Sequence, residues 1–144
     1  MKNIGKKGLY ILLAFSLFLN LWQLDNIKRM DYTQKYIDAT FINELRELDN
    51  SIKDSYITNE GGYRIILSAV GQCRGVVRHT SYSKKNKELV GTIIELETFL
   101  MEYKFNKKSE KKLYELKTYI SKLKENPNDI DITKNLYNYI LTHK

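Results

Sequence analysis

The stretch LYILLAFSLFLNLWQL occupies residues 9–24 and follows a short cationic tail, residues 1–8. As an α-helix it would measure about 24 Å, against a hydrocarbon core of about 30 Å in a bilayer. Basic side chains on both sides, such as Lys7 and Lys28, can extend to the interface and make up the difference. We therefore expect residues 9–24 to form a transmembrane anchor.

A cleaved signal peptide has the same cationic start and apolar run, but it needs small residues one and three positions before the cut. Residues 20–32 contain no Ala, Gly, Ser or Thr, so the sequence favours an uncleaved anchor over a cleaved peptide or a buried helix of a soluble protein. Basic residues on the two sides are nearly balanced, and the short tail decides the expected orientation. We expect a cell-membrane protein with a cytoplasmic N-terminus and the rest of the chain outside the cytoplasm.

Three polar side chains, Ser16, Asn20 and Gln23, share one face of this predicted helix at spacings of four and three residues. Such a row can hydrogen-bond to a neighbouring membrane helix. Alternatively, Asn20 and Gln23 lie in the interface and Ser16 bonds to its own backbone. Of the two arrangements, we expect the second.

The next segment, residues 25–58, contains no Gly or Pro. Its apolar residues recur with a mean period close to 3.6, the period of an amphipathic helix. We expect one long helix here, continuous with the anchor or hinged near Asp25 and Asn26. Pairs of opposite charge four residues apart support it, including Asp49 with Lys53. The residues that set the period are Ile27, Met30, Ile37, Phe41, Leu45, Leu48, Ile52 and Tyr56.

Residues 59–144 carry four more predicted helical segments, over 63–77, over 88–103, after the turn at 106–109, and after Asn126-Pro127-Asn128 with Asp129 or Asp131 as the cap. Residues 80–87 show no period and are expected to form a loop. The predicted fold is all-α, with one N-terminal transmembrane helix followed by an antiparallel bundle of four or five helices. The side chains expected to face the core are Ile66, Val70, Cys73, Val77, Leu89, Ile93, Leu96, Leu100, Tyr103, Leu113, Leu116, Ile120, Leu123, Ile132, Leu136, Tyr139 and Ile140.

One face of the segment 63–77 and the residue after it combines arginines with small residues within about 120° of the helical wheel. Each glycine inside a helix costs about 1 kcal/mol relative to alanine, so something is expected to approach the backbone closely. The face could hold a carboxylate, a phosphate or an acidic helix, and it is the candidate partner-binding surface. The commoner explanation is that another helix of the same bundle packs there and the arginines pair with nearby acids. The candidate residues are Arg64, Gly71, Arg74, Gly75 and Arg78, with Ser68 beside them.

Five lysines surround the turn near residue 106, and this cluster is a second candidate site, for contact with anionic lipid or polymer. An ordinary solvated turn is the alternative. The lysines are Lys104, Lys107, Lys108, Lys111 and Lys112.

Nothing in the sequence indicates catalysis, a cofactor or a metal. The chain has a formal net charge of +7, two histidines and one cysteine, Cys73, which excludes an internal disulfide and a cysteine-based zinc site. Charge of this size, spread along the chain, is below what a nucleic-acid-binding protein concentrates on one face. We therefore expect a single-pass, membrane-anchored interaction module that binds another protein or itself, with a binder of anionic polymer or lipid as the alternative and an enzyme as the least expected reading.

Overall fold

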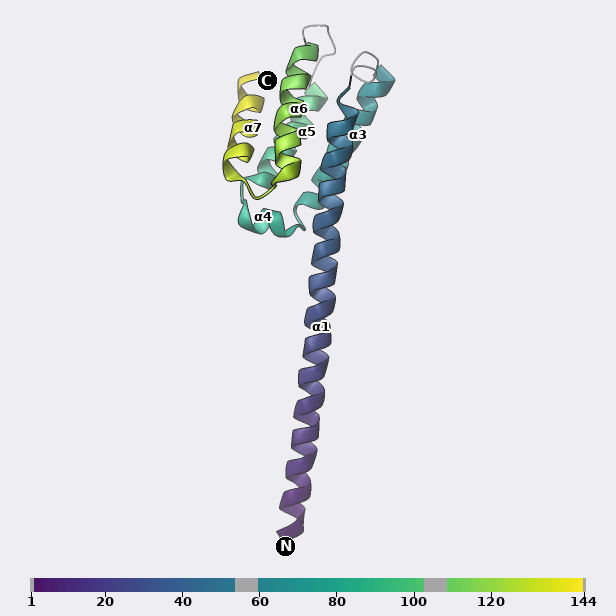
Figure 1. Ribbon diagram of the computed structural model, residues 1–144, viewed down its shortest axis with the longest axis vertical. Helices are drawn as coiled ribbons and strands as arrows, with labels where there is room; N and C mark the ends of the chain where they lie inside the picture. The colour runs from purple at the N-terminus through teal and green to yellow at the C-terminus, as the bar shows by residue number, and fades with distance from the viewer. Residues whose placement is uncertain (1, 54–59, 103–108, 144) are drawn as a thin grey trace. The chain divides into compact units, whose positions relative to one another are not determined.

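The computed structural model describes residues 2–53, 60–102 and 109–143, and these residues form helices and no strand. The predicted all-α fold is confirmed. The chain divides into two compact units, residues 1–36 and 37–144. The helices are α1 (Lys2–Ser51), α3 (Glu60–Val77), α4 (Ser81–Lys85), α5 (Leu89–Glu102), α6 (Ser109–Glu125) and α7 (Ile130–His143) (Figure 1).

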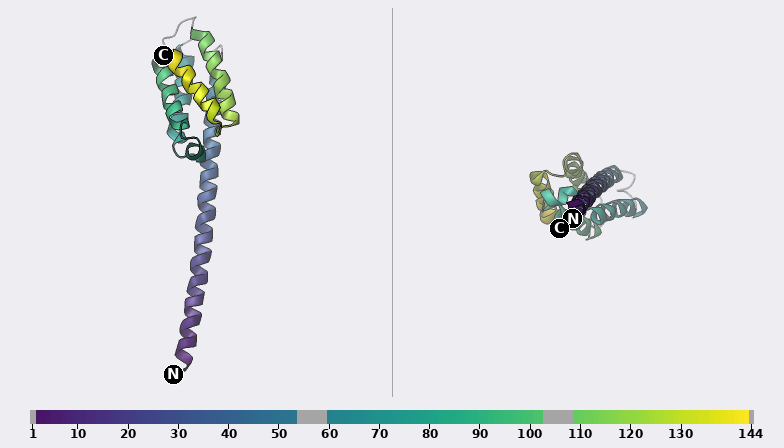
Figure 2. Two further views of the ribbon diagram at one scale, coloured as in Figure 1. Left: turned by 90° about the vertical axis from the view of Figure 1, so that its left-hand side faces the viewer. Right: turned by 90° about the horizontal axis from the view of Figure 1, so that it is seen from below.

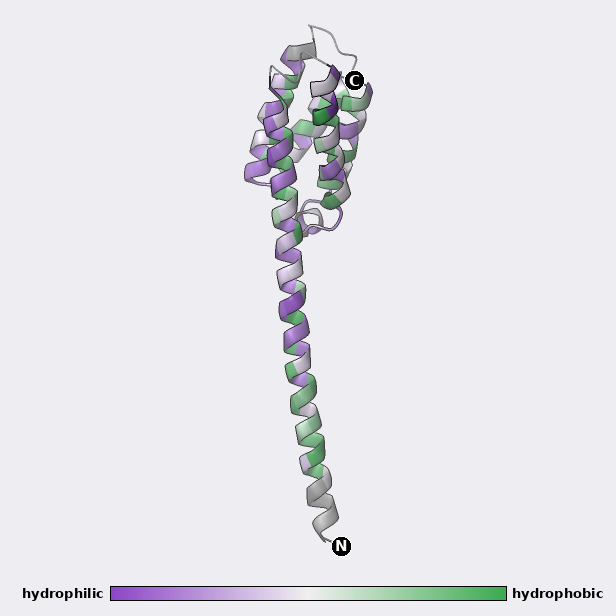
Figure 3. Ribbon diagram, turned by 90° about the vertical axis from the view of Figure 1, so that its right-hand side faces the viewer, coloured by the Kyte–Doolittle hydropathy of each residue, from purple (hydrophilic) through white to green (hydrophobic). Residues whose placement is uncertain are grey.

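The first unit is helical throughout its described residues, with Asp25 and Asn26 inside the helix. Every side chain from residue 9 to residue 24 is exposed, although the run is almost entirely apolar (Figure 3). Among the described residues, this is the helix that is long and apolar enough to cross a membrane. Charged side chains begin at Asp25, which pairs with Arg29 one turn later at 2.9 Å. Polarity therefore changes abruptly at residue 25 along one uninterrupted helix.

The second unit is a helical bundle with its own apolar core. Helix α5 packs against α3 and α7, and α7 packs against α6 (Figures 1 and 2). The described core residues lie between Phe41 and Ile140. The predicted inward-facing residues are buried, except Ile132, which is partly buried against the core, and Tyr103, which lies outside the described residues.

Helix α1 ends at Ser51, so the prediction of one continuous helix is wrong at Ile52 and Lys53, and residues 54–58 of the predicted helix lie outside the described residues. Ile52 leaves the helix and is fully buried. The ammonium group of Lys117 donates to the carbonyl oxygens of Asp49 at 2.7 Å and Ile52 at 2.8 Å. Carbonyl groups at a helix end need partners, and here α6 supplies them in place of another helical turn. Tyr56 lies outside the described residues.

The predicted loop at residues 80–87 contains the short helix α4, so this prediction is also wrong. Thr80 caps the helix by accepting a hydrogen bond from the Ser83 amide at 3.1 Å. Asp38 of α1 accepts two further hydrogen bonds from Ser81, at 2.7 Å from its amide and 2.5 Å from its hydroxyl. A helix of five residues is too short to show a period, and capping side chains stabilise its first turn.

The cap of the last helix was predicted correctly. Asp129 precedes α7, and its carboxylate accepts hydrogen bonds from the amides of Asp131 and Ile132, both at 3.0 Å. These are amides of the first turn, which have no partner within the helix itself. Of the two predicted caps, it is therefore Asp129, and not Asp131, that caps α7.

Candidate interaction surface

The arginine and glycine residues predicted to form a binding face lie along the outer side of α3, opposite its core residues. Arg64, Arg74, Gly75 and Arg78 are exposed, and Gly71 is half-buried. The periodicity of α3 places these residues together because its apolar positions, from Ile66 to Val77, occupy the other side.

Two members of this face are engaged by the neighbouring helix α5. The guanidinium group of Arg74 donates to the carboxylate of Glu97, which is only 7 % exposed. A methyl group added at Gly71 would lie 3.6 Å from the same carboxylate. For Arg74 and Gly71, therefore, the commoner explanation holds: they pack within the bundle. Arg74 is a poor position at which to test partner binding, because a negative charge there would face Glu97.

Arg64 behaves differently. It pairs with Glu60 on its own helix at 2.9 Å, and both side chains are highly exposed, at 76 % and 85 %. An ion pair in such a setting contributes about 0–1 kcal/mol. A stronger acidic ligand could therefore replace Glu60 at little cost in stability.

Among the residues that the structure describes, no packing contact accounts for a glycine at position 75. It is exposed, and a methyl group added there would meet no atom within 4 Å. A helical glycine still costs about 0.8–1 kcal/mol relative to alanine. The exposed Arg78 follows three residues later. Gly75 and Arg78 are the part of the predicted face that the bundle leaves open.

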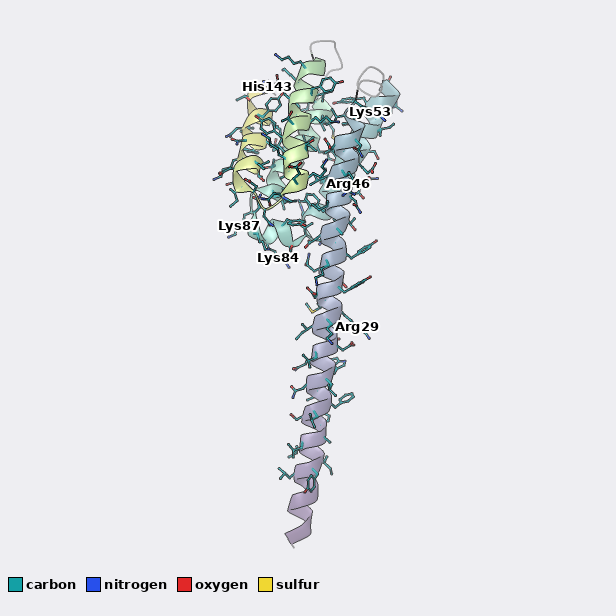
Figure 4. All side chains as sticks on the ribbon, in the orientation of Figure 1. Arg29, Arg46, Lys53, Lys84, Lys87 and His143 are labelled. Atoms are coloured by element: carbon teal, nitrogen blue, oxygen red, sulfur yellow. The ribbon has the colours of Figure 1, made fainter. Side chains whose placement is uncertain are left out.

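Beside this face, a groove of about 480 Å³ runs between the last turns of α1 and the first turns of α3. Its lining is mixed in charge: Glu47 belongs to α1, Lys53 follows the end of α1 (Figure 4), and Arg64 belongs to α3. Ile65 is 45 % exposed at this groove. Sequence reasoning missed the groove because it is formed by two helices whose contact cannot be read from either alone. The lining residues are Glu47, Asn50, Ser51, Lys53, Arg64, Ile65, Ser68, Ala69 and Gln72.

The lysine cluster is described only in part. Lys111 and Lys112 lie in the first turn of α6, whereas Lys104, Lys107 and Lys108 fall outside the described residues. Lys111 is 87 % exposed and lies 3.8 Å from Glu115. The backbone carbonyl of Lys112 accepts a hydrogen bond from the Tyr139 hydroxyl at 2.9 Å. The contact of these lysines with an anionic surface stays a prediction.

Asp49 is a buried acid whose role the sequence did not reveal. Its carboxylate accepts hydrogen bonds from Lys124 at 2.5 Å and from Ser121 at 2.7 Å, both on α6. Burial alone would raise the pKa of Asp49, but these hydrogen bonds and the charges of Lys124 and Lys117 lower it below its ordinary value. Asp49 therefore joins α1 to α6 as a carboxylate.

Asn86 joins the segment after α4 to the turn between α6 and α7 by hydrogen bonds. It is fully buried after α4, and its side-chain amide donates to the Pro127 carbonyl at 3.1 Å and to the Thr133 hydroxyl at 2.7 Å. Asn86 thereby fixes the turn between α6 and α7. In the sequence it is one polar residue among several in a segment without a period, so no signal marked it.

Cys73 and His143 each pack against other residues of the bundle in the part of the chain that the structure describes. Cys73 is fully buried in the core, and burial, together with the charge of Glu44, raises the pKa of its thiol to about 12. His143 stacks on Tyr139 with ring centroids 4.2 Å apart. The described residues contain no group of three or more His, Cys, Asp or Glu placed to hold a metal ion.

No protein-family model, curated protein or solved structure matches this chain. What the chain does has to be inferred from its own residues.

Proposed function

We propose that the chain is a single-pass membrane protein, anchored by residues 9–24, whose helical bundle binds another protein outside the cytoplasm and has no catalytic role. One observation carries the anchor: the most apolar stretch of the chain is exposed along its whole length, while the described core is built from Phe41 to Ile140 without it. Burying one large apolar side chain is worth about 1.5–3 kcal/mol, so leaving this run in water would cost tens of kcal/mol. A bilayer removes that cost.

The anchor is tested by membrane fractionation of cells that express the full chain. We expect the protein to stay in the membrane pellet after an alkaline carbonate wash. Arginine at both Leu13 and Leu17 should release it, since each charge near the bilayer centre costs about 2.5–3.5 kcal/mol. The matched control is arginine at both Tyr32 and Tyr36, which are also exposed but lie outside the run. This variant should stay in the pellet. Wild-type protein in the soluble fraction would contradict the anchor.

Orientation is tested on the same cells with an epitope at the C-terminus. Protease added to intact cells should remove the epitope if the bundle lies outside the cytoplasm. Epitope that is lost only after lysis would place the bundle in the cytoplasm and reverse the proposed orientation.

For the partner, we propose an acidic helical segment that lies on the face formed by Arg64, Gly75 and Arg78. Arg64 and Arg78 supply exposed guanidinium groups, which bind carboxylates through paired hydrogen bonds. Gly75 between them lets a backbone approach closely. The adjacent groove, with Ile65 exposed in it, offers apolar surface beside these charges.

The sharpest test compares Gly75→Ala with Gly91→Ala. Both glycines are exposed in helices, and a methyl group at either would meet no atom within 4 Å. Gly75 lies in the last turn of α3 and Gly91 in the first turn of α5, so each substitution should raise stability through helix propensity by less than the ~0.8–1 kcal/mol of a helix interior. If Gly75 lies under a partner, Gly75→Ala and Arg78→Glu should each lower crosslinking to that partner in intact cells several-fold, while Gly91→Ala should not. Unchanged crosslinking by Gly75→Ala and Arg78→Glu would remove this face as the binding surface.

A further inference from the structure

One face of α1 reverses its polarity where the apolar run ends. Apart from the phenol of Tyr10, the amide and hydroxyl side chains of residues 9–24 are Ser16, Asn20 and Gln23, and all three lie on this face. Residues 25–36 contain two apolar side chains that are not aromatic, Ile27 and Met30, and both lie on the same face. At 100° per residue, the five side chains fall within about 80° of the helix circumference.

This arrangement is unfavourable in both surroundings that the proposed anchor would meet. With the run of residues 9–24 centred in a hydrocarbon core about 6 Å thicker than the run, Asn20 and Gln23 would lie inside that core, which replaces the interfacial position expected from the sequence. An amide without a partner in such surroundings costs several kcal/mol. Beyond the run, Ile27 and Met30 are 62 % and 72 % exposed to water. The same face is thus polar where lipid would surround it and apolar where water would.

We propose that a second copy of this chain covers this face, with two α1 helices side by side and parallel; the proposal rests on the membrane anchor proposed above. The occupant must offer polar side chains within the bilayer and apolar ones directly beyond it, at the same depth. A second copy inserted in the same direction does so by symmetry, since each residue then meets its own counterpart. Interhelical hydrogen bonds among Ser16, Asn20 and Gln23 would satisfy the polar groups, while Ile27 and Met30 bury each other.

The spacing of the face supports a parallel pair. From Ser16 to Met30 the residues follow at intervals of four, three, four and three, a mean of 3.5, which is the repeat of helices that wind around each other. A single Asn at the seam of such a pair fixes its register and the number of helices, and Asn20 has that place. The neighbouring charges are matched within each helix, Asp25 with Arg29 at 2.9 Å and Asp31 with Lys35 at 2.7 Å. Neither pair has to be broken when two faces meet.

The test is disulfide crosslinking of the full chain in native membranes, with single cysteines introduced into a Cys73→Ala background. Ile27→Cys and Met30→Cys lie on the proposed face, and Lys28→Cys and Tyr32→Cys are exposed controls on other faces. Mild oxidation should give at least fivefold more disulfide-linked dimer at positions 27 and 30 than at 28 and 32. Adding Asn20→Leu to Met30→Cys should reduce the yield of dimer several-fold.

The outcomes separate the pair from the anchor. Equal crosslinking at all four positions, strong crosslinking at 28 or 32, or none at 27 and 30 would overturn the pair, as would a crosslinked product that contains a different protein. Carbonate washing of the same membranes reads the anchor independently. Protein that stays in the pellet without crosslinking at 27 and 30 refutes the pair alone, and protein absent from the pellet refutes both.

Discussion

Replacing Asp49 by asparagine keeps the size of the side chain and removes its buried charge. The wild-type carboxylate holds Lys124 at 2.5 Å and Ser121 at 2.7 Å, and its residue is 6 % exposed. Asparagine has one acceptor oxygen, so at least one of these two donors loses its partner. Asp49→Asn therefore weakens the contact between α1 and α6 at a defined point.

The size of the effect follows from the burial of the two partners. Hydrogen bonds to charged groups contribute about 1.5–3 kcal/mol, and breaking a fully buried ion pair costs about 3–5 kcal/mol. The side chain of Lys124 is 25 % exposed and keeps some contact with water. We expect Asp49→Asn to lower the free energy of unfolding by about 2 kcal/mol, which is about 8 °C in Tm for a domain of this size.

The effect should depend on pH with a defined sign. The pKa of Asp49 is lower in the folded chain than in the unfolded one, so its stabilising contribution is complete above the unfolded pKa, near 4. It is lost as the pH falls through the lower, folded pKa. The difference between wild type and Asp49→Asn should therefore be largest at neutral pH and shrink below about pH 4.

Urea unfolding of the full chain in mild detergent, followed by tyrosine fluorescence, measures this difference at pH 7 and pH 3. Glu125→Gln, at the exposed end of α6, removes a carboxylate without such partners and should change stability by less than about 0.5 kcal/mol. An unchanged urea midpoint for Asp49→Asn at pH 7 would refute the reasoning. So would a difference that is the same at both pH values.

Three further predictions concern two connections that only the fold reveals and the buried Cys73. Asp38→Ala removes both hydrogen bonds from Ser81 at the start of α4 and should lower the free energy of unfolding by about 1–2 kcal/mol, read from the urea midpoint. Asn86→Ala leaves buried partners such as the Thr133 hydroxyl with one bond fewer and should cost about 2 kcal/mol, measured as a lower Tm by circular dichroism. Cys73 is buried with the pKa of its thiol raised to about 12, so at pH 8 iodoacetamide should label it at least a hundredfold more slowly in native protein than in urea. Fast native labelling, or wild-type stability in either variant, would contradict the structure at that position.

The sequence predicted the core well because helix amphipathicity is a local property. Leu113, Leu116, Ile120 and Leu123 recur at intervals of three and four residues, and all four are fully buried. Any helix that packs one side must show this spacing, whatever it packs against. The apolar run at residues 9–24 was also recognised from a local property, because its length and unbroken apolar character can be read without knowing any neighbouring helix.

The errors arose where a distant residue determines local structure. Helix α1 ends at Ser51 because Lys117, far along the chain, binds the carbonyl oxygens there. The segment after Thr80 is helical because Asp38 of α1 supplies part of its cap. Asp49 looked like an ordinary partner of Lys53 four residues on, and its hydrogen bonds to α6 have no signature in a single sequence.

The residues of the candidate binding face lie on one side of α3 and of the turn after it, as the helical wheel indicates, but the wheel does not show which of them meet a neighbouring helix. A helical wheel gives the angle between Arg74 and Gly75 without saying which edge meets a neighbour. Helix α5 lies along one edge, so Glu97 engages Arg74 and approaches Gly71, while Gly75 stays open. Packing against α5 accounts for Gly71 and not for Gly75, and this difference can be recognised only when the position of α5 is known.

The described contacts that stabilise the bundle lie within residues 37–144, so the fold of the bundle and the location of the chain can be tested separately. Its described core begins at Phe41, and the buried acids Asp49 and Glu97 find their partners within residues 37–144. With one cysteine the chain forms no internal disulfide, so the bundle's stability comes from this packing and these ion pairs. If residues 9–24 form the proposed anchor, a variant in this run that leaves the membrane pellet while the bundle keeps its urea midpoint has lost its anchoring and not its fold. Conversely, a variant at Asp49 that stays in the membrane pellet but has a lower urea midpoint has lost stability of the bundle and not its anchoring.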